Sequence, residues 1–359
     1  MTPTARNRPP RPTLPAIASS ALLALALGAC ASSPGAGPAA PAAPATDGPI
    51  PLAWSWTEGD VTRYRMTSDT ESTVSGNRLP EPMTSHVRQR IEMTQEVDGV
   101  SEDGVATVLV TYDRLEITTE APGQEEVRWS SDDPESGDDT GMAQLAGAVG
   151  QLVGRTFTLR VDTRGEIVAV EGVDEILGDV AESLAAEEDA AVVRETMEAF
   201  LSEDNLKATV GQALPSFPAR PVAPGDSWTE QTHLALPIFG ALDQRQTYTF
   251  ERLEGDEAVL SLDAEIRLGP DEQAAETVGL PEQIAALMDI EAETRRGDTE
   301  GMIRFDVGRG LLVRQDLTVR MDMTMTMTPK GDLAAQMDEP TVMDVSTTAR
   351  TVYELIGDP

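Results

Sequence analysis

Several residue types are nearly absent from this chain of 359 residues, and each absence limits what the protein can be. Cys30 is the only cysteine, so no disulfide can form within the chain. Aromatic residues make up 4% of the sequence, so a core must rely on Val, Leu, Ile, Met and Ala. The apolar stretch at residues 16–27 is shorter than the roughly 20 residues that a membrane-spanning helix needs.

Positive charge is also scarce. The chain has 27 Lys and Arg against 62 Asp and Glu, for a formal net charge of −35. Such a surface repels phosphate groups, so we expect no nucleic-acid partner. A salty habitat and a GC-rich genome are the favoured explanation of this acidity, and a cationic partner or divalent-ion binding is the alternative, so the charge alone is weak support for any function.

The usual catalytic motifs are missing. His86 and His233 are the only histidines, and neither lies in a recognisable motif. The sequence has no Gly-rich phosphate loop and no Gly-x-Ser-x-Gly turn around a nucleophile. Carboxylate pairs can act as acid and base, but among so many acids no pair stands out. We therefore predict no enzyme, no catalytic residue, no cofactor and no metal ligand, with a carboxylate-based hydrolase as a minor alternative.

The N-terminus has the pattern of a secretory signal. Arg6, Arg8 and Arg11 precede the apolar stretch, which ends in Leu27-Gly28-Ala29-Cys30. This ending resembles the cleavage motif of bacterial lipoproteins. The resemblance implies that residues 1–29 are a lipoprotein signal peptide and that Cys30 is lipidated. Acyl chains such as palmitate on Cys30 would then anchor the protein in the membrane. An ordinary signal peptide with an incidental cysteine is the alternative.

The residue after Cys30 bears on the destination of the protein. Ala31 stands where Asp retains lipoproteins in the inner membrane of well-studied bacteria, so the same resemblance implies the cell envelope, at the outer membrane facing the periplasm. Residues 30–50 are rich in Ala and Pro and contain one charge. Such a segment cannot bury enough apolar surface to fold, so we predict a tether.

The remainder of the chain shows signs of an internal duplication. We predict a β-rich repeat 1 at residues 51–173, a helical connector at 174–212 and a β-rich repeat 2 at 213–359. Three blocks recur in the same order. They are Gly59-Asp60 with Gly225-Asp226, Arg88-Gln89 with Arg245-Gln246, and residues 157–162 with residues 303–307.

Polar and apolar residues alternate within these blocks, which is typical of strands with one wet face. The alternation is longest over residues 311–327 and returns over 343–355, so we expect these two segments to pair. A strand of that length must bend, contain a bulge or belong to a large curved sheet. Helical spacing is predicted at residues 142–152, 176–184, 193–201 and 281–291. The fold class predicted is α+β, mostly antiparallel β: two tandem repeats forming large curved sheet(s), with amphipathic helices between and covering them.

This layout resembles an uncharacterised family of secreted bacterial proteins of unknown function. The similarity rests on the Gly-Asp openings of strands, the Met/Thr alternation and the segment from Pro224 to Trp228. It implies no known activity and no site residue.

Three further motifs have both a chemical and a structural explanation. Met321, Met323, Met325 and Met327 share one strand face, which suits Cu(I) but also simple core packing. The acidic run at residues 132–139 suits Ca²⁺ or a solvated loop. The tripeptide Arg296-Gly297-Asp298 matches an adhesion motif, and we attribute it to chance in a charged turn.

The sequence thus predicts a lipid-anchored, non-enzymatic binding module for an apolar small molecule or an envelope protein. A structural or interaction scaffold of the envelope is the main alternative, and a Met-rich copper-binding protein is a lesser one.

Overall fold

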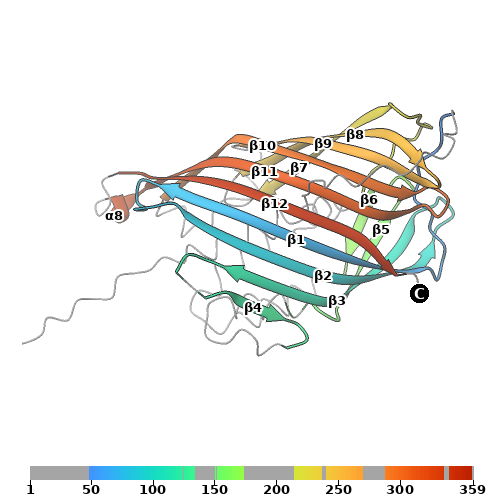
Figure 1. Ribbon diagram of the computed structural model, residues 1–359, viewed down its shortest axis with the longest axis horizontal. Helices are drawn as coiled ribbons and strands as arrows, with labels where there is room; N and C mark the ends of the chain where they lie inside the picture. Colours follow the sequence, from blue (N-terminus) through green and yellow to red (C-terminus); the bar gives the residue numbers. More distant parts are fainter. Residues whose placement is uncertain are drawn as a thin grey trace, which may run out of the picture.

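The computed structural model describes residues 48–123, 125–133, 150, 152–173, 214–236, 240–269, 288–334 and 339–357. Nearly all of this part is antiparallel β-structure (Figure 1). The first half contains β1 (Val61–Gly76), β2 (Met83–Val100), β3 (Ala106–Glu120), β4 (Val127–Ser130), β5 (Thr156–Val161) and β6 (Ile167–Glu171). The second half contains β7 (Ser227–Leu236), β8 (Gly240–Glu254), β9 (Glu257–Gly269), β10 (Met288–Asp306), β11 (Leu311–Pro329), α8 (Gly331–Ala334) and β12 (Thr341–Gly357).

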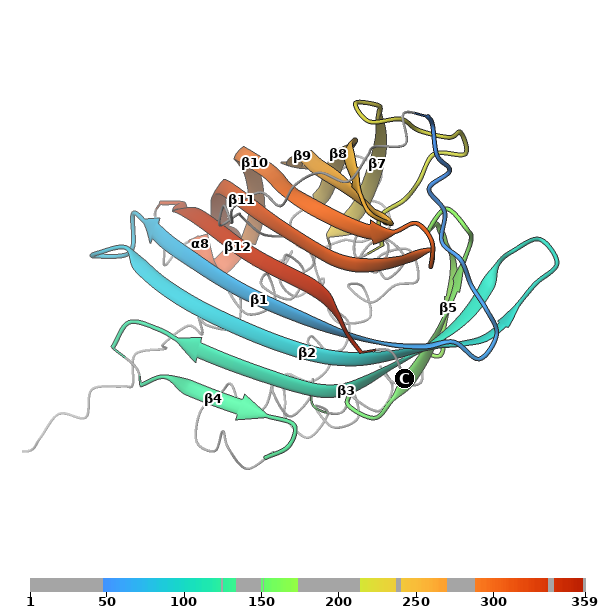
Figure 2. The same cartoon turned by 45° about the vertical axis from the view of Figure 1, so that its right-hand side comes forward.

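The strands form one 12-stranded sheet with the order β6-β5-β3-β2-β1-β12-β11-β10-β9-β8-β7, and β4 pairs with β3 beside this path. Each half is a meander, and the pairing of β1 with β12 joins the two meanders. The long strands are strongly curved, so that the sheet has a concave and a convex face (Figure 2). The predicted pairing of residues 311–327 with 343–355 is confirmed, because β11 and β12 pair from Arg314 and Glu354 to Met327 and Thr341.

The predicted α+β class is wrong for the described residues. The only helical element of the described residues is α8, which has 4 residues. No amphipathic helix covers the sheet in this part of the chain. Residues 288–291, part of the helix predicted at 281–291, are the start of β10. In the sequence, Ile290 follows Leu287 at helical spacing, but it also alternates with the charged residues Asp289 and Glu291 as in a strand. In the structure this segment pairs with β11, so it is a strand. The helices predicted at 176–184 and 193–201, and nearly all of 142–152, lie outside the described residues.

The blocks of the predicted duplication fall at equivalent places in the two meanders. Gly59 and Gly225 both adopt positive φ just before the first strand of their meander, β1 or β7. The second block lies in β2 and β8, and the third lies largely in β5 and β10. A duplication with the boundaries given above stays a prediction.

Burial follows the alternation along each strand. In β9, the alternate residues from Leu260 to Leu268 are buried, while Asp263, Glu265 and Arg267 between them are exposed. In β5, Phe157, Leu159 and Val161 are buried in the same manner, as predicted. Most strands therefore present apolar or neutral polar residues to the concave face and most of their charged residues to the convex face.

At one end the curved sheet closes around two non-strand segments, residues 48–57 and 214–223. Ile50 and Val222 bridge the two segments through a pair of backbone hydrogen bonds of 2.8 Å. Trp54 N–H donates to the Thr163 carbonyl at 2.8 Å, and Phe217 N–H donates to the Arg164 carbonyl at 2.9 Å. Both carbonyls belong to the turn between β5 and β6, so the two segments fasten one edge of the sheet.

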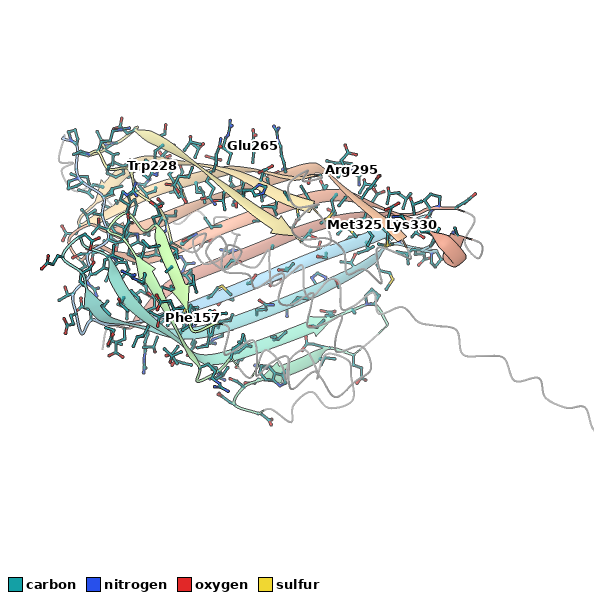
Figure 3. All side chains as sticks on the ribbon, turned by 180° about the vertical axis from the view of Figure 1, so that it is seen from behind. Phe157, Trp228, Glu265, Arg295, Met325 and Lys330 are labelled. Atoms are coloured by element: carbon teal, nitrogen blue, oxygen red, sulfur yellow. The ribbon has the colours of Figure 1, made fainter. Side chains whose placement is uncertain are left out.

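Three tryptophan indoles complete this closure. Trp54, Trp56 and Trp228 donate to the backbone carbonyls of Pro215, Asp162 and Ser216 at 3.1, 3.3 and 2.8 Å. Trp54 stacks on Trp56 and meets Phe305 edge-on, with centroids 5.3 Å apart in both cases. Phe157 and Trp228 lie at this closed end, whereas Met325 and Lys330 lie at the opposite end (Figure 3).

Candidate functional site

Buried polar residues gather in a band across the concave face. Among the described residues, all buried polar side chains except Gln315 and Thr318 fall in three adjacent register rows. We call these residues the polar belt; they are Ser68, Thr70, Ser72, Gln89, Thr119, Gln244, Gln246, Thr299, Thr347 and Thr351. The central row crosses nine strands, from β3 to β7, as Thr119, Val87, Thr70, Ala349, Val319, Thr299, Ala264, Gln246 and Glu230.

Part of the polar belt is satisfied by hydrogen bonds within the protein. The hydroxyls of Ser72 and Thr347 lie 3.0 Å apart, and the Thr351 hydroxyl donates to Ser68 at 3.1 Å. These pairs link β1 to β12 across the join between the two meanders. The Tyr248 hydroxyl, in turn, donates to Gln246 Oε1 at 2.7 Å.

Other atoms of the polar belt have no partner. Thr119 Oγ1, Gln244 Nε2 and Thr299 Oγ1 are buried without a hydrogen bond. Gln315 Oε1 is also unpartnered and faces the same side of the sheet, because Gln315 pairs with the inward residues Tyr353 and Ile303. A buried polar group without a partner costs about 1–3 kcal/mol. Of the seven such atoms among the described residues, these four lie on the concave side, and the other three, in Arg90, Arg114 and Thr318, lie on the convex side. Each of the four on the concave side calls for an explanation.

The polar belt lies between two apolar zones. Toward the closed end, the core contains Tyr64, Tyr353, Phe250 and Phe305, with Tyr64 stacked on Tyr353 at 4.7 Å. A second cluster of aliphatic and sulfur side chains begins within the rows of the belt, at Val319, Ala349 and Met321, and extends toward the other end. It consists of Leu242, Ile266, Leu268, Val319, Met321, Met323, Val345 and Ala349.

Charge is almost absent from the three register rows of the belt. Within their described residues, Glu230 is the only Asp or Glu, and no Lys, Arg or His occurs. Burial raises the pKa of Glu230, and the neighbouring Glu166 raises it further, against a hydrogen bond from Ser216 and the charge of Arg164. The site therefore offers neutral hydrogen-bonding groups in a dry environment.

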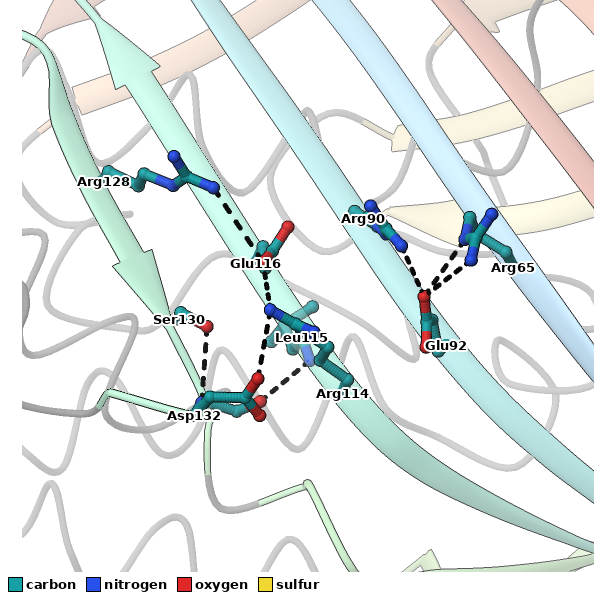
Figure 4. Close-up of polar contacts among 10 residues, drawn as sticks. Arg65, Arg90, Glu92, Arg114, Leu115, Glu116, Arg128, Ser130 and Asp132 are labelled. Carbon is teal, nitrogen blue, oxygen red and sulfur yellow. Dashed lines mark hydrogen bonds and ion pairs between the residues drawn. The ribbon is translucent and has the colours of Figure 1, made fainter.

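The convex face has the opposite character, because its charges form networks that cross the strands. Glu92 accepts hydrogen bonds from Arg65 at 3.0 Å and from Arg90 at 2.7 Å (Figure 4). Arg65 also lies 3.6 Å from Glu354, which is 2.7 Å from Arg314. The hydrogen bond from Arg90 is the main cause that lowers the pKa of Glu92. These networks hold the outer sides of β2, β1, β12 and β11 together.

The two histidines do not form a site. His86 lies on β2, 3.7 Å from Glu71, and His233 lies on the edge strand β7, 2.9 Å from Asp243. Both point to the convex face, with six strands between β2 and β7. In the part of the chain that the structure describes, no three His, Cys, Asp or Glu side chains gather as a metal site would require.

The other motifs have structural positions. Met321 and Met323 are buried in the second apolar cluster, which confirms the packing interpretation for these two residues. The tripeptide starting at Arg296 lies within β10 rather than in a turn, so that part of the prediction is wrong. Its Gly297 faces inward, where a Cβ atom would be 2.3 Å from the Ile266 carbonyl oxygen. Of the acidic run, Asp132 pairs with Arg114 at 3.0 Å, and residues 134–139 lie outside the described residues, as does Cys30.

Sequence reasoning missed the polar belt. Along β1, Ser68, Thr70 and Ser72 alternate with Thr67, Asp69 and Glu71, so neither face of the segment looks apolar. The partners of these residues on β12 lie more than 270 residues away in the chain. The one signal in the sequence was that every second residue of these strands lacks a charge. Only the pairing register of the strands shows that these uncharged residues form a continuous band.

In the part of the chain that the structure describes, fold and site together define a β-protein built on one curved antiparallel sheet, with a band of neutral polar groups on its concave face. The chain belongs to the family of unknown function DUF6263, whose model matches residues 103–312, more than half of the chain. No curated protein matches the sequence. Across the described residues, no helix is both long and apolar enough to cross a membrane.

Solved structures give only distant similarities. A lipovitellin structure described by its lipid–protein interactions has 10% identity and a TM-score of 0.38; the match covers 84% of this chain but 26% of that one. DynF of the dynemicin pathway of Micromonospora chersina has 8% identity and a TM-score of 0.19, covering 90% and 92% of the two chains. The outer membrane protein OprG of Pseudomonas aeruginosa has 6% identity and a TM-score of 0.21, covering 82% and 96%. Since every TM-score is below 0.5, none of these similarities supports an inference.

Proposed function

We propose that this protein is a non-enzymatic binding module whose concave sheet face holds an apolar ligand. The observation behind this proposal is the set of buried, unpartnered polar atoms between two apolar zones. A core built only for stability would gain by replacing Thr299 with an apolar residue of the same shape, because the hydroxyl has no partner. A bound molecule with a polar group between apolar parts would supply the missing hydrogen-bond partners of those atoms.

The setting proposed for this activity is the cell envelope. Lipid on Cys30 would anchor the protein to the membrane, and the Ala/Pro-rich segment after it would hold the sheet at a distance from the bilayer. Outer-membrane placement facing the periplasm is proposed because Ala31, and not Asp, follows Cys30. Hydrophobic cargo would then reach the concave face from the neighbouring membrane, and nucleic acid would be repelled by the acidic surface.

Native mass spectrometry of the full-length protein, released from the membranes of its own host in mild detergent, tests the proposal. We expect a bound mass that disappears on denaturation and is an apolar molecule in the solvent extract. A protein that shows only its own mass, with lipid on Cys30 but no second molecule, would contradict the proposal. The envelope scaffold would then be the better explanation of the acidic convex face.

A further inference from the structure

The unpartnered atoms of the polar belt define the chemistry of the group they would meet, given the ligand proposed above. Gln244 Nε2 is a hydrogen-bond donor, and the Thr299 hydroxyl can donate as well. Both residues are at least nine-tenths buried, with 3% and 2% exposure. Two unpartnered donors on one face require an acceptor, and a carbonyl oxygen is the simplest neutral one.

The spacing of the two residues indicates more than one acceptor. Thr299 lies on β10 and pairs with Ala264 of β9, while Gln244 lies on β8 and pairs with Ile266 of β9. Two strand spacings and an offset of two residues along the strand place their backbones about 12 Å apart, and the Gln244 side chain is long enough to span part of that distance. A molecule with two neighbouring carbonyl groups matches this arrangement better than a single polar atom.

The charge of the site selects against ionised ligands. The described residues of the three register rows contain no Lys or Arg, so a carboxylate or phosphate would be buried without a counter-ion. The only carboxyl group, that of Glu230, lies on the edge strand β7 and is itself favoured in its neutral form by burial. Burying a neutral polar group against this surface therefore costs less free energy than burying an ionised group.

The apolar zones on both sides of the polar belt place the polar group in the interior of the ligand. We propose that the polar belt binds a neutral acyl ester, in which carbonyl groups lie between apolar arms, as in a diacylglycerol. The arms then extend over the aromatic zone around Tyr64 and Phe250 on one side and over Met321 and Met323 on the other. Gln244 and Thr299 donate hydrogen bonds to the ester carbonyls.

Three lipids with matched hydrocarbon chains distinguish the contribution of the carbonyl groups from the effect of a negative charge. Binding to the full chain with Cys30→Ala is measured by calorimetry for 1,2-dioctanoylglycerol, its dioctyl ether analogue and dioctanoyl phosphatidic acid. We expect the ester to bind about a hundredfold more tightly than the ether, which lacks both carbonyl groups, since each of the two hydrogen bonds to a buried donor is worth about tenfold. Phosphatidic acid should bind more weakly still, because its phosphate finds no positive partner.

Two threonine variants provide a matched comparison. Thr299→Val removes an unpartnered buried hydroxyl from the concave face, and Thr318→Val removes one from the convex side of β11, where Thr318 pairs with Glu300 and Arg350. Both variants should keep or raise the melting temperature. Only Thr299→Val should weaken binding of the ester, by about tenfold, and it should leave binding of the ether unchanged.

The possible negative results distinguish an error in the ester assignment from an error in the proposed function. Equal binding of ester and ether, or equal effects of the two variants, would overturn the ester assignment while leaving an apolar ligand in place. Absence of binding by all three probes, with a bound mass present in the protein from its host, would also overturn the ester assignment alone. Absence of both would overturn the proposed function itself.

Discussion

The closed end of the sheet should depend strongly on Trp54. Its side chain is 3% exposed, stacks on Trp56, meets Phe305 edge-on and donates to the Pro215 carbonyl. Replacing a buried aromatic residue with Ala typically costs 3–5 kcal/mol. Because the variant also leaves the Pro215 carbonyl without its donor, we expect Trp54→Ala to lower the free energy of unfolding by about 4 kcal/mol.

Trp54→Phe separates the two contributions. It keeps most of the aromatic contact but removes the indole donor, so the expected loss is about 1–2 kcal/mol. Val100→Ala serves as a control, since Val100 is 40% exposed and its truncation should change stability by about 0.5 kcal/mol or less.

Urea unfolding measures all three variants, and amide hydrogen exchange localises the effect. The Ser55 N–H, bonded to the Gly310 carbonyl at 2.9 Å, should exchange faster in Trp54→Ala than in the wild type. A loss below about 1 kcal/mol in Trp54→Ala, or unchanged exchange at Ser55, would refute the view that this residue fastens the closed end.

Two further predictions concern charge and strand spacing. The pKa of Glu92 is lowered in the folded protein, so its ion pairs stabilise the fold above its ordinary pKa of 4.5 and are lost as pH falls through the lower folded value. The stability difference between wild type and Glu92→Gln should be about 0.5–1 kcal/mol at pH 7 in urea unfolding, and should shrink progressively as the pH falls below 4.5; a difference that does not shrink below that pH would contradict the ion-pair explanation. Gly301→Ala should destabilise the sheet by about 1–3 kcal/mol, because its Cβ would lie 2.4 Å from the Asp316 carbonyl oxygen, whereas Gly99→Ala meets no atom within 4 Å. Equal melting temperatures for these two glycine variants would show that the close approach at Gly301 is not needed.

Local sequence patterns predicted the strands well because each strand alternates between a dry and a wet face. Phe157 to Val161 and Leu260 to Leu268 follow that rule, and β11 pairs with β12 through a short connection as expected. The helix prediction was wrong at residues 288–291 because Ile290 satisfies both a helical and a strand period. Only pairing with a neighbouring strand distinguishes the two, and that pairing is not local.

The candidate site was beyond reach from the sequence for a different reason. Thr70, Thr299 and Gln246 are unremarkable residues in three separate strands, and they share a row only through the pairings from β1 to β12 and onward to β8. This row forms only because β1, the first strand of the first meander, pairs with β12, the last strand of the second meander. No periodicity within either strand encodes that contact.

The central claim is that a ligand occupies the concave face, and methyl NMR of the methionines tests it most directly. Met321 and Met323 lie in the apolar cluster beside the polar belt, whereas Met302 pairs with Asp316 and Ser261 and points to the convex face. We predict that the methyl signals of Met321 and Met323 differ between ligand-bound protein from its host and the delipidated protein, while the signal of Met302 stays unchanged. Identical signals for Met321 and Met323 in the two preparations, or a change at Met302 alone, would contradict the claim.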